Sequence, residues 1–429
     1  MGHGHSHAPE DFPRAAPVVR RRLAAAVSPF VVATLIGLVW LWPGAETPAL
    51  GGTPADIFKA TVTDIEPTDC GDLPSAGAFD CADVMVRLDE GPDEGEVVSF
   101  QAAQGEGGRH YAAGDKVLMS RAPESPPEVA YNFFDYQRGN ALLVLALLFA
   151  VVVVLLSRWK GLSALVGLAV SLIVLIRFVL PAILAGDPPI AVAIVGSAAI
   201  MFVSLYLAHG LNARTTTAVI GTMASLALTG ALAYFFVDFA RFTGFGSEEA
   251  LFLQVSAQQV NLQGLLLGGI IIGTLGVLDD VTVTQASAVW ELHVANPMYS
   301  VRRLYRAAVR IGHDHIASTV NTLVLAYAGA SLPLLILFVL SERPLGQLVT
   351  TEVVAEEIVR TLVGSIGLVA SVPITTALAA IVVRAGRDGA PADGADHDHD
   401  HVEEERASAR PGYRRPKAEE EWRRPLDER

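Results

Sequence analysis

The sequence predicts a mostly α-helical membrane protein, a bundle of eight transmembrane helices with a small external β-barrel or sandwich domain, OB-like in kind, between spans one and two. Two observations predict this fold class. Hydrophobic residues make up 52% of the 429 residues and charged residues only 18%, and several apolar runs reach the roughly 20 residues that cross a bilayer as a helix. One long segment, 44–138, instead has short alternating stretches that are typical of strands.

The apolar runs set the order of the parts. A tail at 1–22 precedes span one at 23–43, and the β domain at 44–138 separates that span from a seven-helix domain at 139–384. A charged tail, 385–429, follows, and both tails are predicted to be disordered and cytoplasmic. The seven later spans are predicted at 140–156, 161–185, 190–208, 215–237, 262–291, 316–340 and 358–383.

The predicted β domain is strongly acidic. Between Glu46 and Arg138 there are 18 Asp and Glu residues against 6 Lys and Arg residues. A nucleic-acid partner needs a basic surface. The acidic composition therefore excludes a nucleic-acid partner, even if the domain has an OB-like shape. The strands are expected where polar and apolar residues alternate between Gly, Pro and Asp clusters, at 58–65, 83–88, 96–101 and 116–120.

Cys70 and Cys81 are the only cysteines of the chain, and both lie in the β domain. A domain outside the cytoplasm allows disulfides, so a Cys70–Cys81 bond is predicted. Two free thiols are the alternative, because sequence does not show how far apart the cysteines lie in space.

Basic residues predict the orientation in the membrane. The short turns assigned to the inner face are rich in Lys and Arg, whereas the outer turns beyond the β domain hold only Arg241 and Arg343. Both termini are therefore predicted in the cytoplasm of a cell whose plasma membrane holds the chain, with residues 44–138 external. Within the inner turns, residues 297–311 form an amphipathic helix that is expected to lie on the anionic leaflet.

Short histidine-rich tracts occur near both ends of the chain. Histidines that alternate with other residues can bind a late transition metal, and the alternative is a tail with incidental histidines. No cofactor is otherwise predicted, although a bound divalent metal stays open. The six histidines are His3, His5, His7, His397, His399 and His401.

The stretch 262–291 carries the most informative pattern. Steps of three and four place small residues and then polar ones on one helical stripe: Gly269, Gly273, Gly276, Asp280, Thr284, Ser287 and Glu291. Lipid cannot form hydrogen bonds with a carboxylate. In one interpretation, this stripe therefore packs against other helices or lines a water-filled cavity. The other interpretation puts Asp279 and Asp280 at the inner membrane boundary, about twenty residues after Leu262.

Two neighbouring spans add polar stripes. Asp314, Ser318 and Asn321 line one side of span seven, with His315 on the next. We therefore predict that spans six, seven and eight pack together with Asp280, Asn321 and Ser371 facing inward. Arg177 in span three and Glu357 and Arg360 in span eight are either part of a transport path or an ion pair between helices.

Four segments are similar to the YibE/F family of multipass bacterial membrane proteins. They are FDYQRGNALLVLALLFAVVVVLLSRWKG at 134–161, GLLLGGIIIGTLGVLDD at 264–280, residues 296–335 from NPMYSVRRLYRAAVRIGHDH onward, and EEIVRTLVGSIGLVASVPITT at 356–376. The resemblance runs from about 59 to 383, and it implies an eight-helix topology with an external domain but no activity. That family has an apolar residue at the position of Asp279 and a basic residue at the position of His313. These differences weaken any mechanism that requires Asp279 or His313.

The favoured functional hypothesis is a secondary transporter or permease for an ion or small solute, with a divalent metal as one candidate cargo. Its candidate residues are Asp280, Asp314, His315, Asn321, Asp279, Thr284, Glu357 and Arg177. Of these, Asp280 is expected to be essential, with Asp314 and His315 as partners, and Asp279 to matter less.

The alternative hypothesis is a non-transporting scaffold whose external domain binds a partner protein, and a homo-oligomer fits either hypothesis. An enzyme is disfavoured, because no Walker A, G-x-S-x-G or H-E-x-x-H motif is present. Asp279 and Asp280 are adjacent on one helix and point about 100° apart, so they cannot share a proton as an aspartyl protease dyad does.

Overall fold

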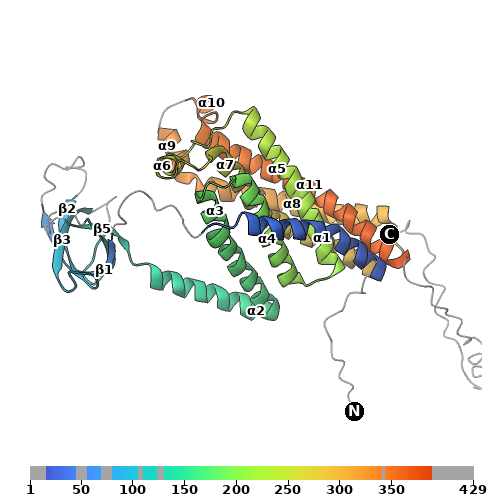
Figure 1. Cartoon of the computed structure of the whole chain (residues 1–429), viewed down its shortest axis with the longest axis horizontal. Coiled ribbons are helices and arrows are strands. Elements are labelled where there is room, and N and C mark those ends of the chain that lie inside the picture. The colour runs from blue at the N-terminus through green and yellow to red at the C-terminus, as the bar shows by residue number, and fades with distance from the viewer. Residues whose placement is uncertain are drawn as a thin grey trace, which may run out of the picture.

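A computed structural model describes residues 16–44, 56–68, 80–104, 110–122, 130–340 and 344–388. It consists of a helical bundle and a small sheet, joined through the long helix α2 (Figure 1). Cys70 and the six histidines of the two tails lie outside the described residues.

The sheet has five antiparallel strands in the order β3-β2-β1-β4-β5. The four predicted strands are confirmed, and a fifth that the sequence analysis missed completes the sheet. The strands are β1 Asp56–Thr68, β2 Asp80–Leu88, β3 Val97–Gln104, β4 Lys116–Arg121 and β5 Tyr131–Tyr136.

Strand β1 curls the sheet into a half-barrel. Its first half pairs with β4 and its second half with β2, and a register shift between Val62 and Asp64 lies where the two pairings meet. This bulge increases the local twist, so that β3 approaches β5 across the open side. The rings of Phe100 on β3 and Phe133 on β5 lie 5.5 Å apart at their centroids, which closes the apolar core.

The bundle contains six helical segments that are long and apolar enough to cross a membrane, and α8 with α9, bent by 63°, would be a seventh among the described residues. The helices are α1 Pro17–Trp40, α2 Gly139–Val174, the π-helix η2 Leu175–Val179, α3 Leu180–Leu184, α4 Pro189–His209, α5 Ala213–Phe239, α6 Glu248–Ser256, α7 Leu262–Ala295, α8 Val301–Ala330, α9 Leu332–Leu340, α10 Leu345–Leu348 and α11 Glu352–Asp388. These apolar helices indicate a protein embedded in a membrane.

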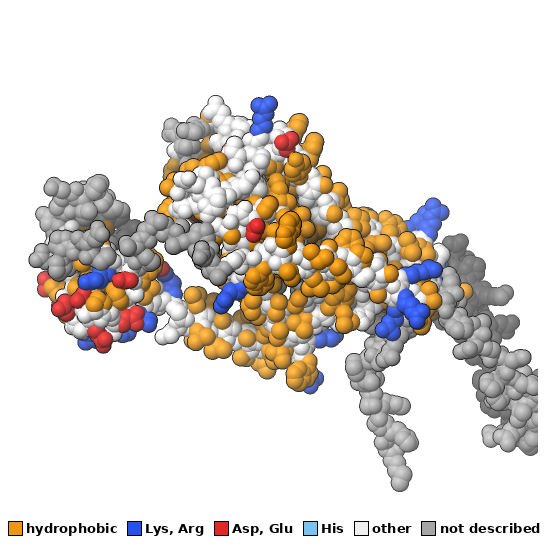
Figure 2. All heavy atoms as spheres, viewed as in Figure 1, with side chains coloured by type: hydrophobic (Ala, Val, Ile, Leu, Met, Phe, Trp, Pro, Cys, Tyr) orange, Lys and Arg blue, Asp and Glu red, His pale blue; other side chains and the backbone are white. Residues whose placement is uncertain are grey.

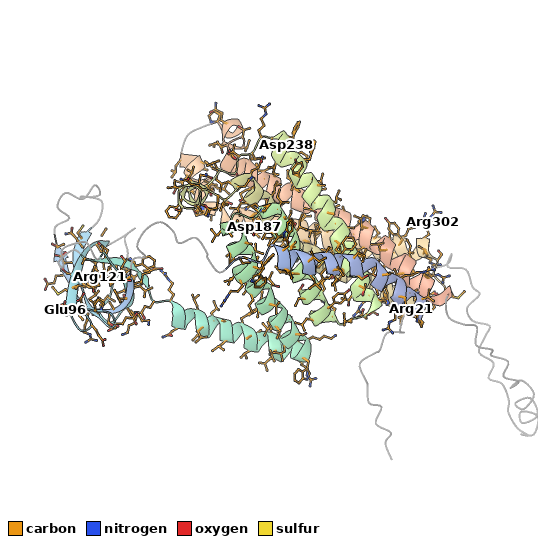
Figure 3. The ribbon with its side chains drawn as sticks, viewed as in Figure 1. Arg21, Glu96, Arg121, Asp187, Asp238 and Arg302 are labelled. Atoms are coloured by element: carbon orange, nitrogen blue, oxygen red, sulfur yellow. The ribbon has the colours of Figure 1, made fainter. Side chains whose placement is uncertain are left out.

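The two ends of the bundle differ in charge. We call the end where α1 begins and α11 finishes the terminal end (Figure 1). Arg21 and Arg302 lie at the terminal end, whereas Asp187 and Asp238 lie toward the other (Figure 3). Between them the visible surface is mostly apolar (Figure 2). The face of the bundle that Figure 2 shows is thus suited to contact with lipid.

Helices α5, α7 and α11 pack against one another at the centre of the bundle. Glycines allow the close approach: a Cβ at Gly367 on α11 would overlap Thr229 on α5, and one at Gly364 would lie 2.9 Å from Thr274 on α7. Small hydroxyl side chains therefore pack directly against neighbouring backbones, and the buried core contains several Ser and Thr residues.

Of two predicted boundaries, one is confirmed and one differs from the structure. Helix α2 runs on from Gly139, but Arg158 has φ 52° and ψ −128°, so the helix turns back at the predicted break between spans two and three. The predicted interfacial helix at 297–311 is wrong as a separate element, because α8 is continuous from Val301 to Ala330. No proline interrupts that segment, and the chain bends only at Ser331, just before Pro333.

Candidate functional site

Asp279, near the middle of α7, is linked by hydroxyl groups to two other helices. Ser204 Oγ on α4 lies 3.5 Å from Asp279 Oδ2, a long hydrogen bond, and the Thr282 hydroxyl donates to the backbone carbonyl of Asp279 at 3.1 Å. Thr222 Oγ1 on α5 lies 2.7 Å from Thr282 Oγ1, one turn further along α7. A chain of hydroxyls therefore ties α4, α5 and α7 together around Asp279.

The second oxygen of that group, Asp279 Oδ1, is buried and has no hydrogen-bond partner within the described residues. A buried acceptor without a partner is costly, more so when it carries charge. The carboxyl group is therefore suited to holding a proton, a cation or a water molecule on Oδ1.

A cavity of about 420 Å³ opens beside this carboxyl group. The second half of α2 and helices α4 and α7 line it, with Ser171, Ser204, His209, Asp279 and Asp280 as its polar side chains. The rest of the lining is apolar or glycine, for example Gly167 and Gly276. Two carboxylates and one imidazole thus face a small space between otherwise apolar helices.

The cavity lies toward the terminal end of the bundle. Ser204 precedes the last residue of α4, His209, by five positions, which is roughly 7 Å along a helix. Asp279 follows the first residue of α7, Leu262, by about 26 Å. Asp279 is thus near the far boundary of a bilayer core of roughly 30 Å that starts at Leu262.

A family model described as YibE/F-like protein matches residues 145–385. This chain belongs to the YibE/F family. The match begins in α2, ends in α11 and includes every helix that lines the cavity. Comparisons with curated proteins and with solved structures found no match.

In this YibE/F protein the small and polar stripe of α7 is its exposed face. Gly269, Gly273, Gly276 and Asp280 are all exposed, and no atom lies within 4 Å of a Cβ built at Gly269 or Gly276. The prediction that Asp280 faces inward is therefore wrong. Both faces of α7 are apolar enough to be buried, so periodicity identified the residues that share a face but not which face is covered.

Asn321 is also exposed, so its predicted inward position on α8 is wrong. Helix α8 packs on α11 and α7 through Leu304, Ala308 and Gly312 near its start, and its later turns are mostly exposed. The predicted inward position of Ser371 on α11 is confirmed, because its side chain is fully buried.

The other predicted site residues do not gather around the cavity. Asp314 is exposed, Thr284 and His315 are half-buried, and Arg177 is exposed on η2 without an ion pair to any described residue. Glu357 pairs with Arg360 at 2.8 Å, but within α11. The predicted pair between helices is therefore wrong, because a spacing of three already brings the two side chains together on one helix.

Sequence reasoning missed Ser204, Thr222 and His209. Each is a single polar residue in or at the end of an apolar helix, and such residues more often bond their own backbone than a neighbouring helix. No group of three or more His, Cys, Asp or Glu residues within the described chain is placed to hold a metal ion. The tail histidines of the metal prediction lie outside the described residues.

Proposed function

We propose that this YibE/F protein is a secondary transporter or permease for an ion or small cationic solute, and that the Asp279 cavity is its site. The observation that carries the proposal is the buried Asp279 Oδ1, which has no partner within the described residues yet lies in a side chain that lines a cavity. Intramembrane carboxylates are costly, and where they occur they commonly mark ion and proton pathways.

The membrane topology we propose has eight spans. The bend at Arg158 would divide the segment Gly139–Leu184 into two, and the bent pair α8 and α9 would supply another span. Lys and Arg residues at the terminal end support a cytoplasmic position for that end in the plasma membrane. The half-barrel, whose five strands and open side fit an OB-like domain, would then be external.

The two adjacent carboxylates, Asp279 and Asp280, have different roles in the proposed mechanism. Asp279 binds the ion or carries the proton, because the Ser204 hydroxyl already bonds its Oδ2 and leaves Oδ1 to the cargo. Asp280 is exposed on the cavity wall, where its negative charge attracts a cation toward Asp279. Asp279 departs from the family pattern, so its role is proposed for this chain alone.

The test uses the full-length protein in sealed vesicles, with proton flux and the uptake of divalent metal ions measured together. Asp279→Asn keeps the shape of the side chain but removes the charge and should abolish flux, while Asp280→Asn should slow it. Asp238→Asn is the matched control, because Asp238 is an exposed carboxylate toward the other end of the bundle and should leave flux unchanged.

Equal flux through wild type and Asp279→Asn would make the carboxyl group structural. A folded wild type that moves neither protons nor any metal ion in the panel would favour the scaffold hypothesis, in which the external domain binds a partner protein. Transport that Asp279→Asn alone abolishes supports the proposal.

A further inference from the structure

A second cavity, unconnected with the proposed transport site, lies at the terminal end of the bundle. It is a groove of about 690 Å³ between the first half of α1 and the turn that joins α4 to α5. Arg20 and Arg21 line one part of it, opposite Tyr206, Asn212 and Thr216. These residues come from three helices, and the functional proposal uses none of them.

The end of the groove near Arg20 and Arg21 is positively charged. Arg20 and Arg21 are exposed, and neither forms an ion pair with a described residue. Opposite them α5 begins, with the Asn212 side chain accepting from the Thr215 backbone N–H at 2.9 Å. The first N–H groups of a helix add partial positive charge there. An anion with several acceptor oxygens fits this charge.

The rest of the groove is apolar. Leu23, Ala24, Val27, Val31 and Val32 continue its wall along α1, away from the arginines. The lining of α1 runs from Pro17 to Val32, which corresponds to about 22 Å of helix. One leaflet of a bilayer, half of the roughly 40–45 Å total, has nearly the same thickness.

We propose that this groove binds one anionic phospholipid, with the headgroup phosphate at Arg20 and Arg21 and an acyl chain along Ala24, Val27 and Val31. An anionic phospholipid is charged at its headgroup and apolar along its acyl chains for the length of one leaflet. The groove has the same arrangement of charged and apolar residues. Arginine suits the phosphate because its guanidinium can donate two parallel hydrogen bonds.

The experiment counts phosphatidylglycerol molecules that stay bound to the full-length protein in native mass spectrometry, with phosphatidylcholine as the neutral comparison. The double variant R20Q/R21Q should lower retention of phosphatidylglycerol by at least about tenfold, since the loss of a single charge-assisted contact already accounts for roughly a factor of ten. The matched control is R302Q/R306Q, which removes two exposed arginines of α8 at the same end and should retain the lipid.

A second pair of variants tests the groove separately from the charge. Ala24 lines the groove, whereas Ala25 is exposed next to it without lining it. Ala24→Trp should fill the apolar part and displace the lipid, while Ala25→Trp should leave it bound.

Loss of lipid in R20Q/R21Q and Ala24→Trp, with retention in both controls, supports the proposal. If the two double arginine variants lose equal amounts of bound lipid, or if Ala24→Trp retains all of it, the lipid is held by diffuse attraction to the basic end. Either result would overturn the proposal. Displacement of the lipid by millimolar inorganic phosphate would assign the arginines to a soluble anion and overturn it as well.

Discussion

Thr376 Oγ1 on α11 donates a hydrogen bond to Gln285 Oε1 on α7 at 3.0 Å, and both side chains are fully buried. The Gln285 amide nitrogen has no partner within the described residues and lies where Gly312 of α8 leaves room for it, 2.8 Å from a Cβ built there. This side chain thus bonds α7 to α11 and lies against α8, where the three helices meet toward the terminal end.

This relationship predicts a non-additive pair of substitutions. Thr376→Val should destabilise the bundle by about 1–2 kcal/mol, because it leaves both polar ends of a buried amide unpaired. The double variant Thr376→Val with Gln285→Leu should recover most of that loss. Unfolding in mixed micelles measures both, with Thr322→Val on the exposed side of α8 as the control. Additive losses in the double variant would contradict a shared bond.

Two glycines inside long helices, Gly312 on α8 and Gly276 on α7, should respond oppositely to alanine. A Cβ at Gly312 would lie 2.5 Å from Val372 Cγ1, so Gly312→Ala should cost about 1–3 kcal/mol through overpacking. Gly276→Ala meets no atom within 4 Å and should stabilise its helix by up to about 1 kcal/mol. Thermal unfolding in the same detergent compares them. A marked loss in Gly276→Ala would mean that another surface covers this face of α7.

The β domain predicts a titration in the alkaline range. Burial, and then the hydrogen bond that Tyr131 donates to Asp93 Oδ2, raises the pKa of Tyr131 to about 12. The folded form therefore holds this proton more tightly than the unfolded chain, whose tyrosine pKa is about 10. The stability from this bond is complete below pH 10 and is lost as the pH rises toward 12.

Tyrosinate absorbance is measured as a function of pH for wild type and Tyr131→Phe. The difference between the two titration curves reports Tyr131, and its midpoint should lie near pH 12. Asp93→Asn should shift that midpoint toward 10, because it removes the negative charge that opposes ionisation. A difference spectrum centred at pH 10 in the wild type would show that Tyr131 is not held in this way.

The Cys70–Cys81 bond stays a prediction. Thr68, the last residue of β1, is paired with Cys81 on β2, so Cys70 follows only two residues beyond that pairing. Labelling of the unfolded, unreduced protein should find no free thiol, and reduction should release two. Two labelled cysteines without reduction would contradict the bond and weaken the external placement of the half-barrel.

The sequence by itself determined the elements and their order. Runs of about twenty apolar residues placed the long helices, because a backbone in lipid must satisfy its own hydrogen bonds. Alternation placed four of the five strands. The strand Tyr131–Tyr136 was missed, since its apolar signal is a short aromatic run immediately before a helix. Ser371 was predicted inside, because a small polar residue in a span seldom faces lipid.

Only the tertiary structure decided which of two adjacent aspartates is enclosed. Asp279 and Asp280 differ by one step of about 100° on the same helix, and on the helical wheel both have a glycine, a threonine and two apolar residues as neighbours. In a helix of a soluble protein, the polar face is the one exposed to solvent. In a membrane helix, the faces that contact lipid and those that contact protein have similar compositions. Ser204 of α4 bonds the half-buried Asp279 carboxylate, whereas Asp280 is exposed on the cavity wall. That choice depends on how helices far apart in the sequence pack, which no single helical pattern records.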